Sequence, residues 1–389
     1  MITIQEAAEL LQVEPKMLSS FEEPDPFNNN QIIKGYLCRQ SDHRYGALVI
    51  CSVDNEDTKP QVIYCTPKLH YPFERGSKYD EERKYNFPRF VKVEVYHKLD
   101  GTNILLYSYR NNYGRRFITY KTRLTPIVKA NTYGSFVSLW KEILRENPNI
   151  GIDNYLKTGA VSKSYELYGY RNHHLVKYDI PLSAQLLFLV QQDDASIIPP
   201  RNFGVSPIAE CNSKEDLIKL YKRLREEANS NNTLVNAKTD EEYIEGIEGY
   251  VFYVLDITGK WQMFKCKAEQ AEQIHWATGS LPKQVILPTI WSALENTTDI
   301  TLEYIKELLL EEFSVQQVEK SINKIQTCIS IIQEKVELRA RVKILYKMSN
   351  LDINIDGKGP VMRYISGYIN KDKMRHAFTA LVELGIAER

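Results

Sequence analysis

Alternation of hydrophobic and polar residues predicts β-strands through most of the first 280 or so residues. Residues 90–96 (Phe-Val-Lys-Val-Glu-Val-Tyr) alternate with a period of two. Residues 104–109 and 117–120 flank Asn111-Asn112-Tyr113-Gly114, which is typical of a hairpin. Further strands are predicted at 36–38, 47–50, 62–64, 164–168, 185–191, 249–254 and 261–265. The pattern therefore predicts a strand-rich body.

Helical spacing appears at two places in the body and dominates the last hundred or so residues. Within the body, apolar positions in 135–146 and 214–228 recur at helical intervals, and the short stretch 4–21 is also apolar-periodic. After about residue 281, segments 300–313, 315–348 and 374–384 are helix-periodic, and 350–360 reads as a loop. We predict an α+β domain at 1–283 and an all-α domain at 284–389.

Composition is that of a globular protein with a sizeable core. Hydrophobic residues make up 43% and charged residues 26%, which excludes a disordered, collagen-like or small disulfide-stapled chain. No apolar run approaches the roughly 20 residues that a membrane helix needs, and the N-terminus lacks the features of a secretory signal. Six scattered cysteines without C-x-x-C spacing favour reduced thiols over a zinc site. We expect a cytoplasmic protein without membrane contact.

Net charge changes the picture only locally. Lys plus Arg (50) equals Asp plus Glu (50), which argues against a non-specific duplex-coating protein. Residues 92–179 hold 14 Lys and Arg against 7 Asp and Glu, whereas residues 193–260 hold 8 against 13. The basic middle segment suits a phosphate ligand, but random clustering explains it equally well.

The strongest local signal is Tyr-His-Lys-Leu-Asp-Gly-Thr-Asn at residues 96–103. Lys98 ends an alternating strand, Gly101 permits a tight turn, and Asp100 falls on the same strand face as Lys98. A free lysine has a pKa near about 10.4 and attacks only after losing a proton, which burial and neighbouring cations favour. The pattern K-x-D-G alone is not specific, because a surface lysine at a turn gives the same sequence.

Three later segments add chemistry in a fixed order. Glu166 lies in an aromatic strand followed by Gly169, and Glu248 precedes Gly249 and a second apolar strand. Lys265 and Lys267 are two residues apart in the next strand, so that both face the same side, as binding a phosphate chain requires.

This ordered set, K-x-D-G, E-x-x-G, E-G-aromatic-V and K-x-K, resembles the motifs of the lysine-dependent nucleotidyltransferases, which include polynucleotide ligases and mRNA capping enzymes. The details look most like ATP-dependent RNA ligases of the phage tRNA-repair type. The resemblance covers about residues 44–267. It implies an adenylyltransferase domain of ATP-grasp-like antiparallel sheets with flanking helices, extended at its N-terminus ahead of Lys98, and a helical tail.

The resemblance also implies roles for individual residues. Lys98 would attack the α-phosphate of ATP, expel pyrophosphate and become lysyl-AMP. Glu166 would hold the ribose hydroxyls and Phe188 would stack on adenine. Lys265 and Lys267 would neutralise charge that develops on the α-phosphate.

A divalent ion, Mg²⁺ or Mn²⁺, would be held by Glu248 and Asp100, according to the same resemblance. Further nucleotide contacts would come from residues of several motifs: Arg44, Lys68, Asp100, Gly101, Asn103, Arg123 and Glu248. The group's lysine before a paired phenylalanine is replaced here by Leu-His-Tyr-Pro-Phe at residues 69–73. Lys68 is the substitute that the chain offers, and the pyrophosphate contacts stay open.

The implied activity is the joining of an RNA 5′-phosphate to a 3′-hydroxyl through lysyl-AMP and adenylated RNA, as in RNA repair. Two alternatives stay open: a DNA ligase or capping enzyme of the same superfamily, and a non-catalytic RNA-end-binding protein. DNA ligases and capping enzymes of this superfamily carry an OB barrel after the K-x-K segment, whereas long helices are predicted here. The sealed RNA (nicked duplex, tRNA loop or single strand) is open, as is whether the helical domain selects it or forms a homodimer.

Overall fold

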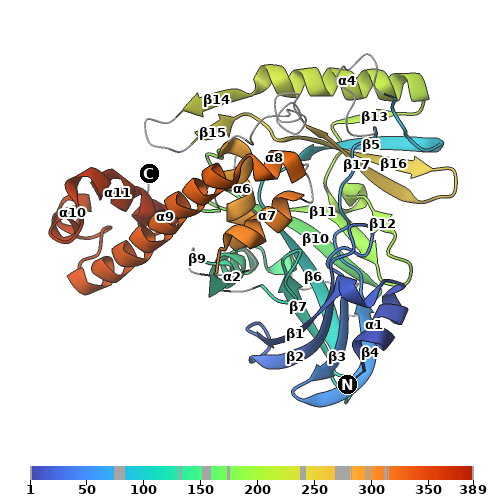
Figure 1. The fold of residues 1–389 in the computed structure, drawn as a ribbon, viewed down its shortest axis with the longest axis horizontal. Helices are drawn as coiled ribbons and strands as arrows, with labels where there is room; N and C mark the ends of the chain where they lie inside the picture. Colours follow the sequence, from blue (N-terminus) through green and yellow to red (C-terminus); the bar gives the residue numbers. More distant parts are fainter. Residues whose placement is uncertain are drawn as a thin grey trace.

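The computed structural model describes residues 2–73, 84–128, 130–131, 134–150, 159–172, 176–236, 242–267, 281, 283–294, 297, 299–310, 313 and 315–387. Two antiparallel sheets face one another in its body (Figure 1). One has the order β13-β5-β16-β17, and the other has the order β12-β11-β10-β6-β7. The predicted α+β class with antiparallel sheets is confirmed.

The first of these sheets carries the lysine strand at an inner position. Its strands are β13 (Ala209–Cys211), β5 (Phe90–Lys98), β16 (Gly249–Asp256) and β17 (Trp261–Lys267). Because side chains alternate along a strand, Val93 and Val95 pack in one core with helix α4 (Lys214–Asn231), which covers the outer face. Tyr96 belongs to the other core, between the sheets. Lys98 has the same parity as Tyr96 and therefore faces inward.

The second sheet is covered on its outer face by helix α2 (Phe136–Glu146). Its strands are β12 (Ile197–Ile198), β11 (Ser183–Gln191), β10 (Val161–Tyr168), β6 (Thr102–Arg110) and β7 (Arg116–Lys121). Trp140 of α2 is fully buried and packs on Tyr120 and Tyr165. The opposite face supplies Leu105 and Phe188 to the core between the sheets.

The N-terminal segment forms a third antiparallel sheet with the order β1-β2-β3-β4. Helix α1 (Ile4–Leu11) precedes the strands β1 (Leu18–Asp25), β2 (Gln31–Cys38), β3 (Leu48–Val53) and β4 (Glu56–Ile63). Tyr109 of β6 donates to Asp25 Oδ2 over 2.9 Å, and Asn28 Nδ2 donates to the Ile118 carbonyl over 2.8 Å. These buried hydrogen bonds attach the third sheet to the β6–β7 edge of the body.

Helices make up the regular structure described after β17. They are α6 (Lys283–Leu294), α7 (Leu302–Leu310), α8 (Val315–Glu319), α9 (Ile322–Ser349), α10 (Lys358–Ser366) and α11 (Met374–Glu383). Helix α9 links two hydrophobic clusters: its first half packs with α6 to α8, and its second half packs with α10 and α11. The second cluster projects from the body (Figure 1).

The remaining described elements are short. They are η1 (Pro15–Met17), β8 (Ala130–Asn131), β9 (Gly134–Ser135), η3 (Pro148–Ile150), η4 (Pro200–Phe203), β14 (Thr233–Asn236), β15 (Glu242–Glu245) and η5 (Lys371–Lys373).

The structure confirms the helical tail and corrects three local predictions. The apolar stretch 4–21 splits into α1, η1 and the start of strand β1. The predicted helix 315–348 is broken near Ser321 into α8 and α9, and the predicted loop 350–360 contains the start of α10. The division into domains at residue 283 stays a prediction. No described helix has both the length and the apolarity that crossing a membrane requires.

Candidate active site

A cavity lies between the two facing sheets, at the end of β5. It holds about 630 Å³ of empty space when the solvent at its open mouth is included. Five predicted site residues line it: Lys98, Asn103, Arg123, Glu166 and Phe188. Apolar walls are contributed by Leu69, Tyr96, Leu186, Leu187, Val251, Tyr253 and Met263. The arrangement suits a ligand with a flat apolar part and a charged part.

Strand pairing brings the catalytic candidate Lys98 close to Lys267. Gly249 of β16 pairs with Lys98 on one side and with Lys267 on the other, so that all three stand in one row across the sheet. Lys98 Nζ donates to Glu248 Oε2, and Lys267 Nζ lies 2.9 Å from Glu248 Oε1. One carboxylate therefore bridges two ammonium groups that are far apart in the sequence.

Glycine at position 249 is required by the close packing of this row. Its φ is +145°, and a Cβ atom there would lie 2.1 Å from the Cys266 carbonyl oxygen. The missing side chain lets the backbones of β16 and β17 approach closely at this point. A second close approach occurs at Gly101, where a Cβ atom would lie 2.2 Å from the Leu167 carbonyl oxygen. The lysine loop thereby fits directly against β10.

Lys265 takes the next inward position of β17. It pairs with Val251, which lines the cavity, and its side chain is buried. Its Nζ lies 4.6 Å from the centroid of the Tyr71 ring, a cation–π contact. Neither Lys265 nor Lys267 lines the cavity itself. Lys267 is linked to the cavity residue Lys98 through Glu248, and Lys265 lies two residues before it on the same face of β17.

Glu248 is ionised in this setting. Although burial opposes ionisation, Lys267 and Lys98 lower the pKa of the Glu248 carboxyl to about 2. A permanent negative charge thus holds the two lysines in place at neutral pH.

The carboxyl group of Glu166 has a raised pKa, in contrast to that of Glu248. Burial raises the pKa of its carboxyl to about 7, and Glu248 and Asp100 add to the rise against the opposing Lys98 and Arg123. The side chain enters the cavity from the second sheet, across from Lys98. A carboxyl group poised between its two forms near neutral pH can accept or donate a hydrogen bond to a hydroxyl group.

Asp100 is fixed to the segment that follows β10. Its Oδ2 accepts from the Val176 backbone N–H over 2.7 Å, and its own N–H donates to the Tyr178 hydroxyl over 2.8 Å. Burial and the neighbouring Glu248 raise the pKa of the Asp100 carboxyl to about 6. Two hydrogen bonds therefore hold the loop that follows Lys98 against the segment 176–178.

Asn103 serves mainly as an anchor. Its Oδ1 accepts from the Thr66 hydroxyl over 2.7 Å, and its Nδ2 donates to the Ser164 hydroxyl over 2.8 Å and to the Tyr165 carbonyl over 3.2 Å. These bonds join the segment before the lysine strand to β6 and β10. The amide shapes the cavity wall more than it offers groups to a ligand.

Arg123 enters the cavity from the bend that follows β7. The fully buried Lys121 donates from Nζ to the Thr122 carbonyl over 2.8 Å and to the Arg123 carbonyl over 2.9 Å. Thr122 and Thr125 share a hydroxyl hydrogen bond of 2.7 Å across the same bend. The two basic residues of the segment 121–123 therefore have different roles. Lys121 fixes the backbone of the bend, and Arg123 lines the cavity.

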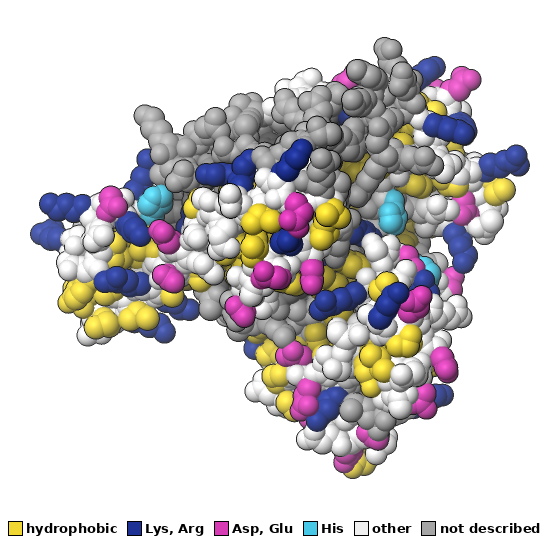
Figure 2. All heavy atoms as spheres, in the orientation of Figure 1, with side chains coloured by type: hydrophobic (Ala, Val, Ile, Leu, Met, Phe, Trp, Pro, Cys, Tyr) yellow, Lys and Arg dark blue, Asp and Glu magenta, His cyan; other side chains and the backbone are white. Residues whose placement is uncertain are grey.

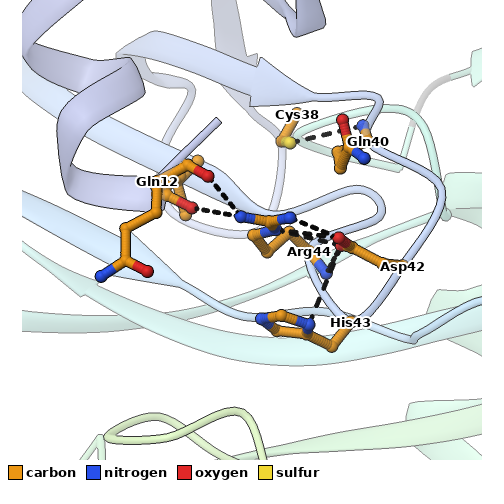
Figure 3. A network of polar contacts seen from close by, with 7 residues as sticks. Gln12, Cys38, Gln40, Asp42, His43 and Arg44 are labelled. Carbon is orange, nitrogen blue, oxygen red and sulfur yellow. Dashed lines mark hydrogen bonds and ion pairs between the residues drawn. The ribbon is translucent and has the colours of Figure 1, made fainter. Parts of the chain in front are cut away.

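Arg44 and Lys68 are not brought to the cavity. Arg44 Nε donates to Asp42 Oδ1 over 3.1 Å, and its Nη1 donates to the carbonyls of Leu11 and Gln12 at the end of α1 (Figure 3). A cation at a helix C-terminus stabilises that helix. Lys68 Nζ lies 5.6 Å from the Tyr45 ring centroid. Their nucleotide-binding roles stay predictions that these contacts do not favour.

The two residues predicted to hold a metal ion, Glu248 and Asp100, are not part of a larger group of possible metal ligands within the part of the chain that the structure describes. Among the described residues there is no group of three or more metal-ligating side chains. Mg²⁺, however, commonly binds through one or two carboxylates and completes its shell with substrate phosphates and water. The Glu248 carboxylate already contacts the amines of Lys98 and Lys267, and the assignment of Glu248 and Asp100 to the ion stays a prediction. When bound, the ion would shield phosphate charge.

Gln185 is a cavity residue that the sequence patterns did not single out. Register pairs Glu166 of β10 with Asn103 of β6 and with Gln185 of β11, so the three side chains share one face. All three line the cavity. The signal was present in the alternation of 185–191, but it becomes visible only once β11 is paired with β10.

Replacing Glu166 by glutamine should change stability in a pH-dependent way. The folded protein holds a proton on Glu166 that the unfolded chain releases above about pH 4.5, so this group destabilises the fold progressively as pH rises from 4.5 to 7. Glu166→Gln removes that effect and gains at most about 3 kcal/mol relative to the parent between pH 5 and pH 8. Urea unfolding at pH 5 and at pH 8 measures the free energy of unfolding of the parent and of the variant. Glu146→Gln, at the exposed end of α2, is the control. An equal stability difference at both pH values would contradict the assignment.

Gln185→Leu should weaken the predicted binding of ATP more than it slows the predicted transfer of AMP. The substitution keeps the bulk of the side chain and removes an amide beside Glu166, and a single hydrogen bond is worth about 0.5–1.5 kcal/mol. We expect KM for ATP to rise up to about tenfold with kcat nearly unchanged. Steady-state kinetics of AMP transfer measure both. Gln333→Leu on the exposed face of α9 is the control, and an equal change in both variants would remove Gln185 from the site.

Comparison with known proteins gives few matches. No protein-family model matches the chain, and no curated protein matches it. Among solved structures, it is similar to an archaeal ATP-dependent RNA ligase, with a TM-score of 0.46 and 13% identity over 82% of this chain and 81% of that one. A Naegleria gruberi RNA ligase mutant with ATP and Mn gives a TM-score of 0.33 and 14% identity, over 69% of this chain and 81% of that chain. At these values the likeness carries no argument, and the function proposed below rests on the residues of the site.

Proposed function

We propose that this protein is an ATP-dependent RNA ligase that becomes adenylylated on Lys98. The observation that carries the proposal is the row Lys98–Gly249–Lys267 with Glu248 bridging the two amines, set at a cavity that Glu166 and Arg123 also line. Acids and cations from distant strands converge there on one lysine. Such clustering of charged groups in a cleft is typical of a functional site.

In the first step, Lys98 Nζ loses a proton to a solvent base and attacks the α-phosphorus of ATP. An N–P bond forms as the bond between the α-phosphorus and the bridging oxygen of pyrophosphate breaks, and pyrophosphate leaves. Lys265 and Lys267 lie on the same face as Lys98 and would stabilise the charge that develops on the α-phosphate oxygens. Glu166 would bind the ribose hydroxyls, and Phe188 would pack against the base within the cavity.

In the following steps, AMP would pass from Lys98 to the 5′-phosphate of RNA, and a 3′-hydroxyl would displace AMP and form the phosphodiester. The helices that follow β17 favour an RNA ligase over the DNA ligase and capping alternatives, because those enzymes carry an OB barrel at this point. Participation in RNA repair, with Mg²⁺ or Mn²⁺ and in the cytoplasm, is part of the proposal.

Incubation with α-labelled ATP and Mg²⁺, with and without RNA bearing 5′-phosphate and 3′-hydroxyl ends, tests the proposal. We expect a labelled protein that loses its label to the RNA and a sealed product. An adduct with GTP alone would transfer the assignment to a capping enzyme, and sealing of DNA alone to a DNA ligase. Absence of an adduct with every nucleotide, combined with RNA binding, would leave only the non-catalytic alternative.

A further inference from the structure

The far end of the helical region is strongly basic in a chain whose net charge is zero. Residues 338–375, which span the second half of α9, α10, η5 and the start of α11, contain nine Lys and Arg and three Asp. The preceding segment, 299–337, contains four Lys and eight Asp and Glu. The sign of the charge therefore reverses along α9. We call residues 338–375 the basic tip.

Most cations of the basic tip face solvent. Two are engaged by carboxylates: Arg339 is buried and lies 3.6 Å from Glu383, and Lys373 lies 3.3 Å from Glu334. The other seven are exposed and make no ion pair with a described carboxylate: Arg341, Lys343, Lys347, Lys358, Arg363, Lys371 and Arg375. Figure 2 shows Lys and Arg side chains gathered on this projecting part of the molecule. The described carboxylates therefore leave these seven charges unneutralised, although Lys358 Nζ lies 3.2 Å from the centroid of the Phe378 ring.

Aromatic rings lie among these cations. Tyr368 is 49% exposed, and its ring centroid lies 5.3 Å from that of Tyr364. Arg341 Nη2 donates to the Tyr368 carbonyl over 2.6 Å, which places a guanidinium next to the pair. Cations beside accessible aromatic rings are the combination that binds single-stranded nucleic acid, because phosphates pair with the cations and bases stack on the rings.

We propose that the basic tip binds a single-stranded stretch of RNA away from the ends that are joined. This inference rests on the proposed function, since it assigns the tip to the same RNA that reacts at Lys98. Charge complementarity favours RNA as the partner, and the tyrosine pair favours unpaired over duplex RNA. Helix α9 has 28 residues, and at 1.5 Å per residue it extends roughly 42 Å. A contact at its far end is therefore available only to an RNA long enough to reach it.

Fluorescence anisotropy with the full chain tests the proposal without ATP. The probes are a long unstructured RNA and a short oligonucleotide of the same end chemistry. We expect Lys343→Ala/Lys347→Ala/Arg363→Ala/Lys371→Ala to weaken binding of the long RNA by tenfold or more, on the order expected when several cations that pair with phosphates are removed. The slope of log K against log salt should fall by about 0.7 for each phosphate that is no longer neutralised, and binding of the short oligonucleotide should not change. Tyr368→Ala should weaken binding with little effect on the slope.

A matched variant, Lys214→Ala/Lys219→Ala/Arg223→Ala, removes exposed cations from α4 and should leave both affinities unchanged. Equal decreases in affinity for both variants, or for both RNAs, would overturn the proposal. So would unchanged RNA binding accompanied by abolished binding to phosphatidylserine vesicles, or by conversion of a dimer to a monomer. Adduct formation with labelled ATP is followed in parallel: its absence in every variant refutes the proposed function and leaves the binding result standing.

Discussion

Lys98→Ala should abolish the covalent protein–AMP adduct and all sealing that depends on ATP. Lys98 is the one described lysine that lines the cavity, so the described residues offer no second amine there. Because the variant lacks only the carrier of AMP, it should still seal RNA that is supplied already adenylated. Gel assays with α-labelled ATP and with pre-adenylated RNA measure the two activities.

The control for this prediction is Lys59→Ala, which removes an exposed lysine from strand β4. It should form the adduct at the parental rate. An adduct of undiminished yield in Lys98→Ala would show that the nucleophile lies elsewhere and would refute the assignment of Lys98.

Lys265→Ala and Lys267→Ala should each slow adduct formation by about 10²- to 10³-fold, as the removal of other charge-stabilising donors does. Both amines stand on the face of β17 that looks toward Lys98, and Lys267 also holds Glu248 at 2.9 Å. Removal of Lys267 should therefore misplace Glu248 in addition to deleting a charge. Single-turnover measurements at saturating ATP separate the chemical step from binding.

Lys260→Ala is the matched control, because Lys260 lies in the turn of the same β16–β17 hairpin and is exposed. Its rate should equal that of the parent. Equal slowing in all three variants would indicate a general effect on the hairpin and would remove Lys265 and Lys267 from the chemistry.

The site residues could be predicted from sequence where the signal is local. Lys98, Glu166 and Lys267 lie in strands whose alternation sets the face that each side chain takes, and the structure places all three around the cavity or at its mouth. Their convergence could not be predicted from periodicity, because it depends on β16 pairing with both β5 and β17. Gln185 was missed because its place at the cavity depends on another pairing, that of β11 with β10.

Other misses have specific physical causes. Strand β1 was not among the predicted strands. It contains Pro24, and β1 is the edge of its sheet, where a missing N–H is tolerated. Pro360 belongs to the predicted loop 350–360, yet it lies in the first turn of α10, where no intrahelical donor is needed. The nucleotide contact of Arg44 stays a prediction, whereas its contact with the end of α1 joins residues distant in sequence, which periodicity does not reveal.

The most direct test of the account is to locate the adenylyl group on the protein. After incubation with ATP and Mg²⁺, the chain is digested and its peptides are analysed by mass spectrometry under mildly alkaline conditions, which preserve a phosphoramidate. The account predicts one AMP on the peptide that contains Lys98, absent when pyrophosphate is added in excess. AMP on any other residue, or none on a protein that nevertheless seals RNA with ATP, would contradict it.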